Sequence, residues 1–134
     1  MSKPVTAPDI RTHKVKDGHD PLVMVTAYDA PGARIADEAG VDLILVGDSV
    51  AMVVLGYDDT LSVTVDDMAH HVAAVARAKP RSLIVGDLPW MSYHLSPEET
   101  VRNAAALIRR GAQAVKLEGG AKRVPMVDAI VDAE

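Results

Sequence analysis

The feature that most constrains the fold is a short apolar run closed by a glycine and an acid, and it occurs twice. Residues 43–49 read LILVGDS, and residues 82–87 read SLIVGD. A short apolar run that ends at glycine is typical of a strand buried on both faces in a parallel sheet. Residues 112–120, AQAVKLEGG, end in a lysine, an acid and a glycine pair. Parallel α/β folds keep their chemistry at the C-terminal ends of strands, so the pattern predicts the sheet and the place of a site together.

Helical patterns alternate with these strands. Asp29 and Thr64 are predicted N-caps, the latter with Asp67 as its capping-box partner, and Ser96-Pro97 is the clearest helix start. We expect strands at residues 22–26, 43–46, 82–87 and 112–118, and helices at about 30–39, 65–79, 97–110 and after residue 120. Residues 8–16 form either a short helix or an arm. Four successive strand–helix units predict right-handed βαβ connections and a parallel sheet, hence the α/β class.

One segment breaks this rhythm. Two short apolar runs, residues 52–55 and 61–63, flank the turn-forming sequence GYDDT. Such an arrangement predicts a β-hairpin. Because it would lie at the acid-bearing end of a strand, we expect it to form a wall or lid over the site.

Composition narrows the function classes. The chain has 134 residues, enough for one domain, with a net charge of −5 and no cysteine. The net negative charge gives no indication of a basic surface that would bind nucleic acid. The apolar runs are far shorter than the ~20 residues that cross a bilayer, and no secretory signal pattern opens the chain. Without cysteine, disulfides and thiolate metal sites are excluded, and we expect a cytoplasmic protein with no membrane or nucleic-acid partner.

Side-chain alternation predicts where the polar groups of the last strand point. Lys116 and Glu118 share a face with small alanines, while Val115 and Leu117 face the covering helices. Asp48 and Asp87 are then expected to converge with Glu118 at one end of neighbouring strands. Three oxygen ligands suit a hard cation such as Mg²⁺, and the adjacent lysine could bind a substrate carboxylate.

Each candidate also has a plain structural explanation. Acids at strand ends often cap the next helix, and Gly-Asp turns are common. Lys116 could be only an ion-pair partner of Glu118, and Ser49 only a helix or turn cap. Three acids on three successive strands favour function over these alternatives.

Other polar and aromatic side chains are weaker candidates. His70 and His71 lie on a predicted helix, where packing or surface roles are expected. Trp90 and Met91 are expected to be loop core. His94, in a loop after a strand, stays open.

Five motifs in register carry a resemblance to a known family. They are MVTAYD at 24–29, LVGDS at 45–49, GYDDTL at 56–61, GDLP at 86–89 and VKLEGG at 115–120. Together they resemble the ketopantoate hydroxymethyltransferase (3-methyl-2-oxobutanoate hydroxymethyltransferase) family. The resemblance implies a (β/α)₈ TIM-type barrel of the phosphoenolpyruvate/pyruvate superfamily, of which residues 1–134 form a single domain of about four βα units.

The resemblance also implies a reaction. It is the Mg²⁺-dependent transfer of a hydroxymethyl group from 5,10-methylenetetrahydrofolate to 3-methyl-2-oxobutanoate, which gives 2-dehydropantoate for pantothenate and coenzyme A synthesis. By the family pattern Asp48, Asp87 and Glu118 hold the metal, and Asp48, Ser49, Asp87 and Lys116 contact the oxo acid. The family further implies a homo-oligomer, a decamer at full length.

The chain departs from the family pattern in one respect. An eight-stranded barrel takes roughly 200–250 residues, whereas four strands are expected here. The family's general base is a glutamate on a later strand, beyond Glu134. Two alternatives therefore stay open: a superfamily lyase or mutase acting on another 2-oxo acid, and a catalytically silent half-barrel. In an open half-barrel we expect exposed inner side chains such as Val46 and Val85, with poor solubility or obligate assembly as the result.

Overall fold

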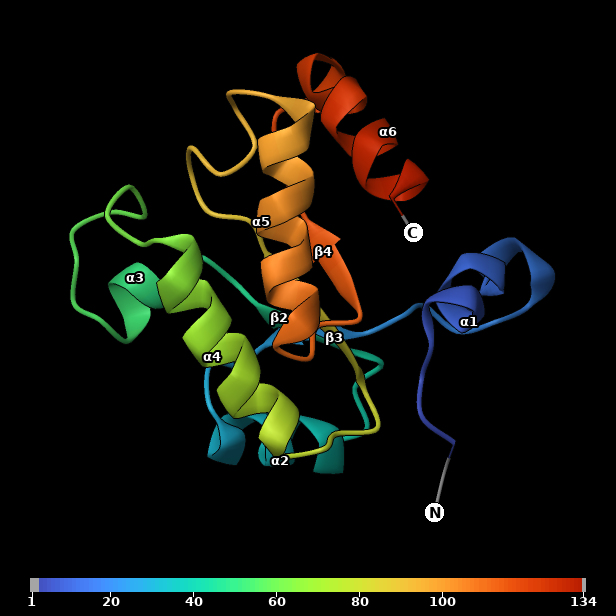
Figure 1. Cartoon of the computed structure of the whole chain (residues 1–134). Coiled ribbons are helices and arrows are strands. Elements are labelled where there is room, and N and C mark those ends of the chain that lie inside the picture. The colour runs from blue at the N-terminus through green and yellow to red at the C-terminus, as the bar shows by residue number, and fades with distance from the viewer. Residues whose placement is uncertain (1–2, 134) are drawn as a thin grey trace.

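The computed structural model describes residues 3–133 and contains the expected parallel sheet (Figure 1). Its strands are β1 (Met24–Thr26), β2 (Leu43–Val46), β3 (Leu83–Asp87) and β4 (Ala114–Lys116). They lie in the order β1-β2-β3-β4, and every neighbouring pair is parallel. The predicted α/β class and parallel sheet are confirmed.

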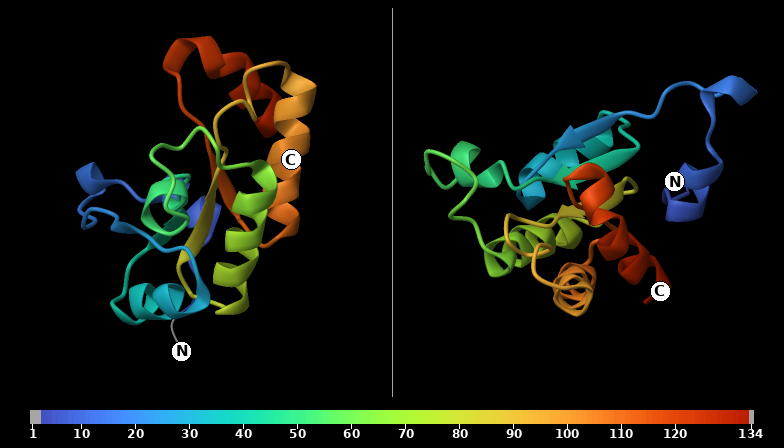
Figure 2. Two further views of the ribbon diagram at one scale, coloured as in Figure 1. Left: turned by 90° about the vertical axis from the view of Figure 1, so that its left-hand side faces the viewer. Right: turned by 90° about the horizontal axis from the view of Figure 1, so that it is seen from above.

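The longer helices cover one face of the sheet. The longer ones are α2 (Ala30–Glu38), α4 (Val65–Arg77), α5 (Pro97–Arg109) and α6 (Val124–Asp132). The short ones are α1 (Ala7–Thr12), α3 (Val50–Val53) and two 3₁₀ turns, η1 (Val15–Asp17) and η2 (Gly120–Arg123). Helix α4 packs beside α5 and α6 beside α5 (Figure 2). No helix among residues 3–133 has the length and apolar content to cross a membrane.

Side-chain caps fix where these helices begin. Thr64 and Asp67 form the predicted capping box of α4, with reciprocal bonds between side chain and backbone. The Asp29 carboxylate accepts from Gly32 N–H at 2.7 Å, and the Ser96 hydroxyl accepts from Glu99 N–H at 3.1 Å. Each bond satisfies a backbone donor that a helix terminus would otherwise leave free.

The main core lies between the sheet and the helices. Alternate strand residues point into it, among them Ile44, Val46 and Ile84, and they meet Met68, Val72, Val75 and Leu107. Burial of each such side chain contributes about 1.5–3 kcal/mol. Val46 is 0% exposed, so its expected place on an open inner face was wrong: it faces the helices.

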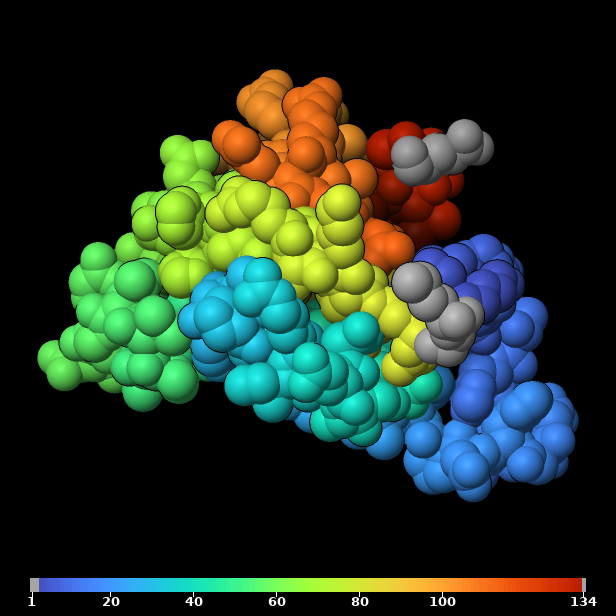
Figure 3. All heavy atoms as spheres, turned by 90° about the horizontal axis from the view of Figure 1, so that it is seen from below, coloured from blue at the N-terminus to red at the C-terminus, as the bar shows by residue number. Residues whose placement is uncertain are grey.

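The opposite face of the sheet is covered at β2 and β3, while Met24 of β1 is 46% exposed. Leu43, Leu83 and Val85 form a second buried cluster, packed by Val5, Ile10 and Leu22. The Val5 N–H donates to the Arg81 carbonyl at 2.8 Å, which fixes the N-terminal segment beside the residues leading into β3 (Figure 3). Val85 is therefore only 6% exposed. The expectation that it would be exposed was wrong because the N-terminal segment covers this face.

The predicted hairpin is also wrong. Residues 50–53 form α3, and Val53 N–H and Val54 N–H donate to the carbonyls of Ser49 and Val50. Because these backbone groups are bonded locally, residues 52–55 are unavailable for strand pairing. Residues 54–63 continue in turns, and Gly56 takes a φ of 78°. The segment is an excursion of the chain, as expected, but it contains no strand.

Gly111 offers a test of how closely α4 approaches the turn before β4. It has a φ of +112°, and an added Cβ would lie 2.5 Å from the Ala76 Cβ. Gly111→Ala is expected to lower the free energy of unfolding by about 3 kcal/mol, from left-handed strain plus overpacking. Urea denaturation followed by circular dichroism measures the loss.

Gly40 is the matched control. It has a φ of +83° but open space around its Cβ position. Gly40→Ala should cost only the conformational strain, about 1 kcal/mol. Equal losses in the two variants would show that α4 does not limit the space at Gly111.

Candidate active site

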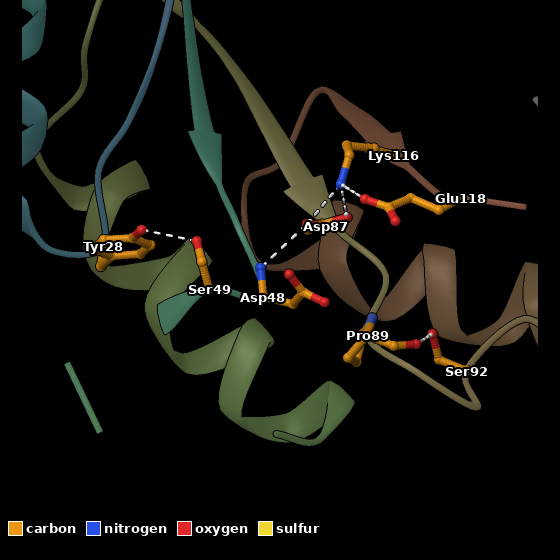
Figure 4. Close-up of polar contacts among 8 residues, drawn as sticks. All are labelled: Tyr28, Asp48, Ser49, Asp87, Pro89, Ser92, Lys116 and Glu118. Atoms are coloured by element: carbon orange, nitrogen blue, oxygen red, sulfur yellow. Dashed lines mark hydrogen bonds and ion pairs between the residues drawn. The ribbon is translucent and has the colours of Figure 1, made fainter. Parts of the chain in front are cut away.

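The C-terminal ends of three adjacent strands bring the predicted polar residues into one region (Figure 4). Asp48 and Ser49 follow β2, Asp87 is the last residue of β3, and Lys116 is the last residue of β4. Asp87 is 3% exposed, Asp48 and Ser49 are half-buried, and Glu118 is exposed. The site thus has a buried carboxylate at its base and an exposed one at its rim.

Lys116 joins the two carboxylates on its side of the site. Its Nζ donates to both carboxylate oxygens of Asp87 at 3.0 Å and to Glu118 Oε1 at 2.7 Å. The sheet register pairs Asp87 with Lys116 directly, and strand alternation places Glu118 on the same side as Lys116. The predicted shared face is confirmed, and so is the ion pair between Lys116 and Glu118.

Asp48 approaches Asp87 through its backbone. The Asp48 N–H donates to Asp87 Oδ2 at 3.1 Å. The Asp87 carboxylate therefore accepts from a backbone amide on β2's side and from the ammonium on β4's side. A buried carboxylate needs such partners, since its desolvation is otherwise costly.

The local charges shift three pKa values. Burial, and then the negative charge of Asp87, raise the pKa of the Asp48 carboxyl. Burial opposes the charge of Lys116, but hydrogen bonds to Glu118 and Asp87 outweigh it and raise the pKa of the ammonium. The hydrogen bond from Lys116 lowers the pKa of Glu118. At neutral pH the ammonium stays charged, and the surroundings of Asp48 favour its protonated form more than those of Glu118 do.

Ser49 is turned toward a residue to which sequence reasoning assigned no role. Its hydroxyl lies 2.9 Å from the Tyr28 hydroxyl, and among residues 3–133 it makes no hydrogen bond to Asp87, Lys116 or Glu118. Ser49 occupies the N-cap position of α3, yet its side chain makes no capping bond. Tyr28 lies in the motif at residues 24–29, but this motif alone indicates no function for the tyrosine.

The donor chemistry of the site suits a hard cation, because its free atoms are carboxylate oxygens. Within residues 3–133, however, no group of three or more histidine, cysteine, aspartate or glutamate side chains is arranged to hold a metal ion. Lys116 lies between Asp87 and Glu118 and bonds both. The metal-ligand role of Asp48, Asp87 and Glu118 stays a prediction.

The loop after β3 forms one border of the site. Trp90 is 51% exposed and Met91 is also exposed, so their predicted place in a loop core was wrong. The loop is held instead by Ser92, whose hydroxyl donates to the Pro89 carbonyl at 2.6 Å. His94 stacks on Tyr93, and burial followed by the charge of Arg123 lowers the pKa of its imidazole.

The fold of the chain is similar to that of several solved enzyme structures. A phosphoenolpyruvate phosphomutase from Streptomyces platensis subsp. rosaceus matches with a TM-score of 0.74 at 18% identity, over 96% of this chain and 50% of that one. A 2,3-dimethylmalate lyase of the PEP mutase/isocitrate lyase superfamily matches with a TM-score of 0.68 at 23% identity, over 96% of this chain and 48% of that one. At these identities the likeness shows the fold alone: about half of a TIM-type barrel.

Sequence relatives are much closer. The 3-methyl-2-oxobutanoate hydroxymethyltransferase of Ignicoccus hospitalis is 61% identical over 131 residues, which are 98% of this chain and 49% of that protein. The enzyme of the same name from Bacillus subtilis is 59% identical over 108 residues, 80% of this chain and 39% of that protein. The chain thus spans about half the length of the curated relatives it matches.

The family comparison covers nearly the whole chain. The sequence model described as ketopantoate hydroxymethyltransferase matches residues 4–134. This span contains strands β1 to β4 and the site residues Asp48, Asp87, Lys116 and Glu118. The chain belongs to the ketopantoate hydroxymethyltransferase family.

Proposed function

We propose that this chain supplies the metal- and oxo-acid-binding residues of a hydroxymethyltransferase. The reaction would move a hydroxymethyl group from 5,10-methylenetetrahydrofolate to 3-methyl-2-oxobutanoate and give 2-dehydropantoate, a step of pantothenate synthesis. One observation supports it most: Asp87, Lys116 and the Asp48 backbone meet at the ends of three adjacent strands.

Asp48, Asp87 and Glu118 would hold Mg²⁺. The Lys116 ammonium already bonds oxygens of Asp87 and Glu118 within 3.0 Å, so these two carboxylates can converge on one positive charge. When bound, Mg²⁺ would act as a Lewis acid for the 2-oxo and carboxylate oxygens of the substrate and favour the enolate.

The protein side chains would bind and orient the oxo acid. Lys116 presents an ammonium to an anionic carboxylate, and its raised pKa keeps that charge at neutral pH. The buried carboxylate of Asp87 forms an ion pair with Lys116. Ser49 supplies a hydroxyl group next to Asp48. The family resemblance assigns removal of the C3 proton to a glutamate on a later strand, so we assign it to no residue of this chain.

The resemblance also supports a homo-oligomeric, cytoplasmic enzyme, a decamer at full length. The exposed apolar side chains of the α3 segment are compatible with assembly; they include Met52, Val53, Val54, Leu55, Tyr57 and Leu61. A large exposed apolar surface is typical of protein–protein contacts.

The transfer reaction is tested with the protein carrying all eight barrel units. Incubation with 5,10-methylenetetrahydrofolate, 3-methyl-2-oxobutanoate and Mg²⁺ should release tetrahydrofolate, which is measured by its absorbance. Cleavage or rearrangement of a 2-oxo acid without release of tetrahydrofolate would support a superfamily lyase or mutase instead.

Asp87→Asn should weaken Mg²⁺ and oxo-acid binding together, since one carboxylate would serve both. We expect the Kd for each to rise at least about tenfold, as for the loss of a charge-assisted contact. Isothermal titration calorimetry measures both constants, and circular dichroism checks that the buried site still folds.

Two further variants sharpen this experiment. Glu118→Gln changes an exposed side chain and should raise the Kd for Mg²⁺ without harming the fold. Asp58→Asn, in the exposed α3–α4 segment, is the control and should change neither constant. Unchanged oxo-acid binding in Asp87→Asn would refute the shared-ligand model.

The proposed role of Asp48 predicts a cost in stability when no metal is bound. Its pKa is raised in the folded protein, so its charge at neutral pH opposes folding. Asp48→Asn should therefore raise the urea midpoint at pH 7 in the presence of EDTA. The two midpoints should converge below about pH 4, where the carboxyl is protonated in both the folded and the unfolded state. A lower midpoint at pH 7 would contradict the prediction.

A further inference from the structure

Tyr28 reaches the site from a strand that contributes no acid to it. It lies just beyond β1, and its hydroxyl is 2.9 Å from Ser49 Oγ (Figure 4). The candidate site described above comes from the ends of β2, β3 and β4. The contact between Tyr28 and Ser49 extends this site to the end of β1.

The backbone around Tyr28 is fixed from several sides. The Ala27 N–H donates to the Leu45 carbonyl at 3.1 Å, which continues the pairing of β1 with β2. His71 on α4 donates from Nδ1 to the Tyr28 carbonyl at 2.7 Å, since a carbonyl can only accept. The next residue, Asp29, caps α2. Tyr28 is therefore held at both its hydroxyl and its carbonyl.

We infer that Tyr28 is a positioning residue that aims the Ser49 hydroxyl at the carboxylate of the oxo acid. This inference rests on the proposed function. Each hydroxyl carries one hydrogen, so only one of the two can donate within the pair. A phenol O–H is a stronger hydrogen-bond donor than an aliphatic alcohol, so Tyr28 donates to Ser49 Oγ. The Ser49 hydrogen then points away from Tyr28 and is free to donate to a ligand.

The arrangement has two consequences for binding. A serine hydroxyl that rotates freely must lose that freedom when a ligand binds, whereas a hydroxyl fixed beforehand does not. A hydroxyl that accepts one hydrogen bond is also a stronger donor in the next, because such chains polarise one another. Both effects strengthen oxo-acid binding without any contact between Tyr28 and the ligand.

Tyr28→Phe separates this role from packing. The ring of Tyr28 packs against the main core, and phenylalanine retains the ring while removing the hydroxyl. With saturating Mg²⁺, the Kd for 3-methyl-2-oxobutanoate should rise about three- to tenfold, the effect of losing one neutral hydrogen bond. The Kd for Mg²⁺ alone and the urea midpoint should stay close to wild type. Tyr57→Phe, at a tyrosine 45% exposed, is the matched control.

A double-mutant cycle shows whether Tyr28 acts through Ser49. Ser49→Ala should weaken oxo-acid binding, and Tyr28→Phe should add nothing further in the Ser49→Ala protein. Additive losses, or no loss in Tyr28→Phe alone, would overturn the inference. Parallel losses of Mg²⁺ affinity and stability would also overturn it, because they would show a structural role.

The same titrations distinguish this inference from the proposed function. If the wild-type protein binds no oxo acid in the presence of Mg²⁺, the proposed function fails for this chain and the inference fails with it. If the wild type binds and Tyr28→Phe binds equally well, only the role of Tyr28 is refuted.

Discussion

The pairing of Asp87 with Lys116 across β3 and β4 is the interaction on which the site depends. Direct register places the two residues opposite one another, and their side chains share the face that bears Glu118. Asp87 is buried and would be costly without this partner. The same contact therefore makes the strand end stable and gathers the charges that a small anionic substrate and a cation would require.

Two layers on opposite sides of the sheet keep that register in place. Helices α4 and α5 cover one side, while the segment containing Val5 and Ile10 covers the other. A one-residue slip of a strand would turn each buried residue to the wrong side. Because both sides of β3 are packed by apolar side chains, the position of Asp87 relative to Lys116 is set by the core as well as by the polar contact.

Local pattern predicted most of the sheet, the helix caps and the shared face of Lys116 and Glu118, because these follow from periodicity and parallel pairing. The local pattern failed where contacts between residues far apart in the sequence determine burial, or where one segment suits two kinds of secondary structure. The sequence near Val85 does not indicate that residues 5–10 will cover its side chain. The apolar residues 52–55 are equally compatible with a strand or a helix. Tyr28 was missed because a lone tyrosine after a strand has no signal of its own. Its partner, Ser49, is supplied by the next strand.

The N-terminal segment imposes an order on folding. It is synthesised before β3, yet the side chains it covers, Leu83 and Val85, belong to β3, and the Arg81 carbonyl that it bonds lies just before that strand. During synthesis, the side chains of Ile10 and its neighbours therefore stay exposed to solvent until β3 has left the ribosome. Docking of this segment is a contact between residues far apart in the sequence, and such contacts slow folding. Substitutions at Val5 or Ile10 will thus lengthen the interval in which the nascent chain is open to chaperones and proteases.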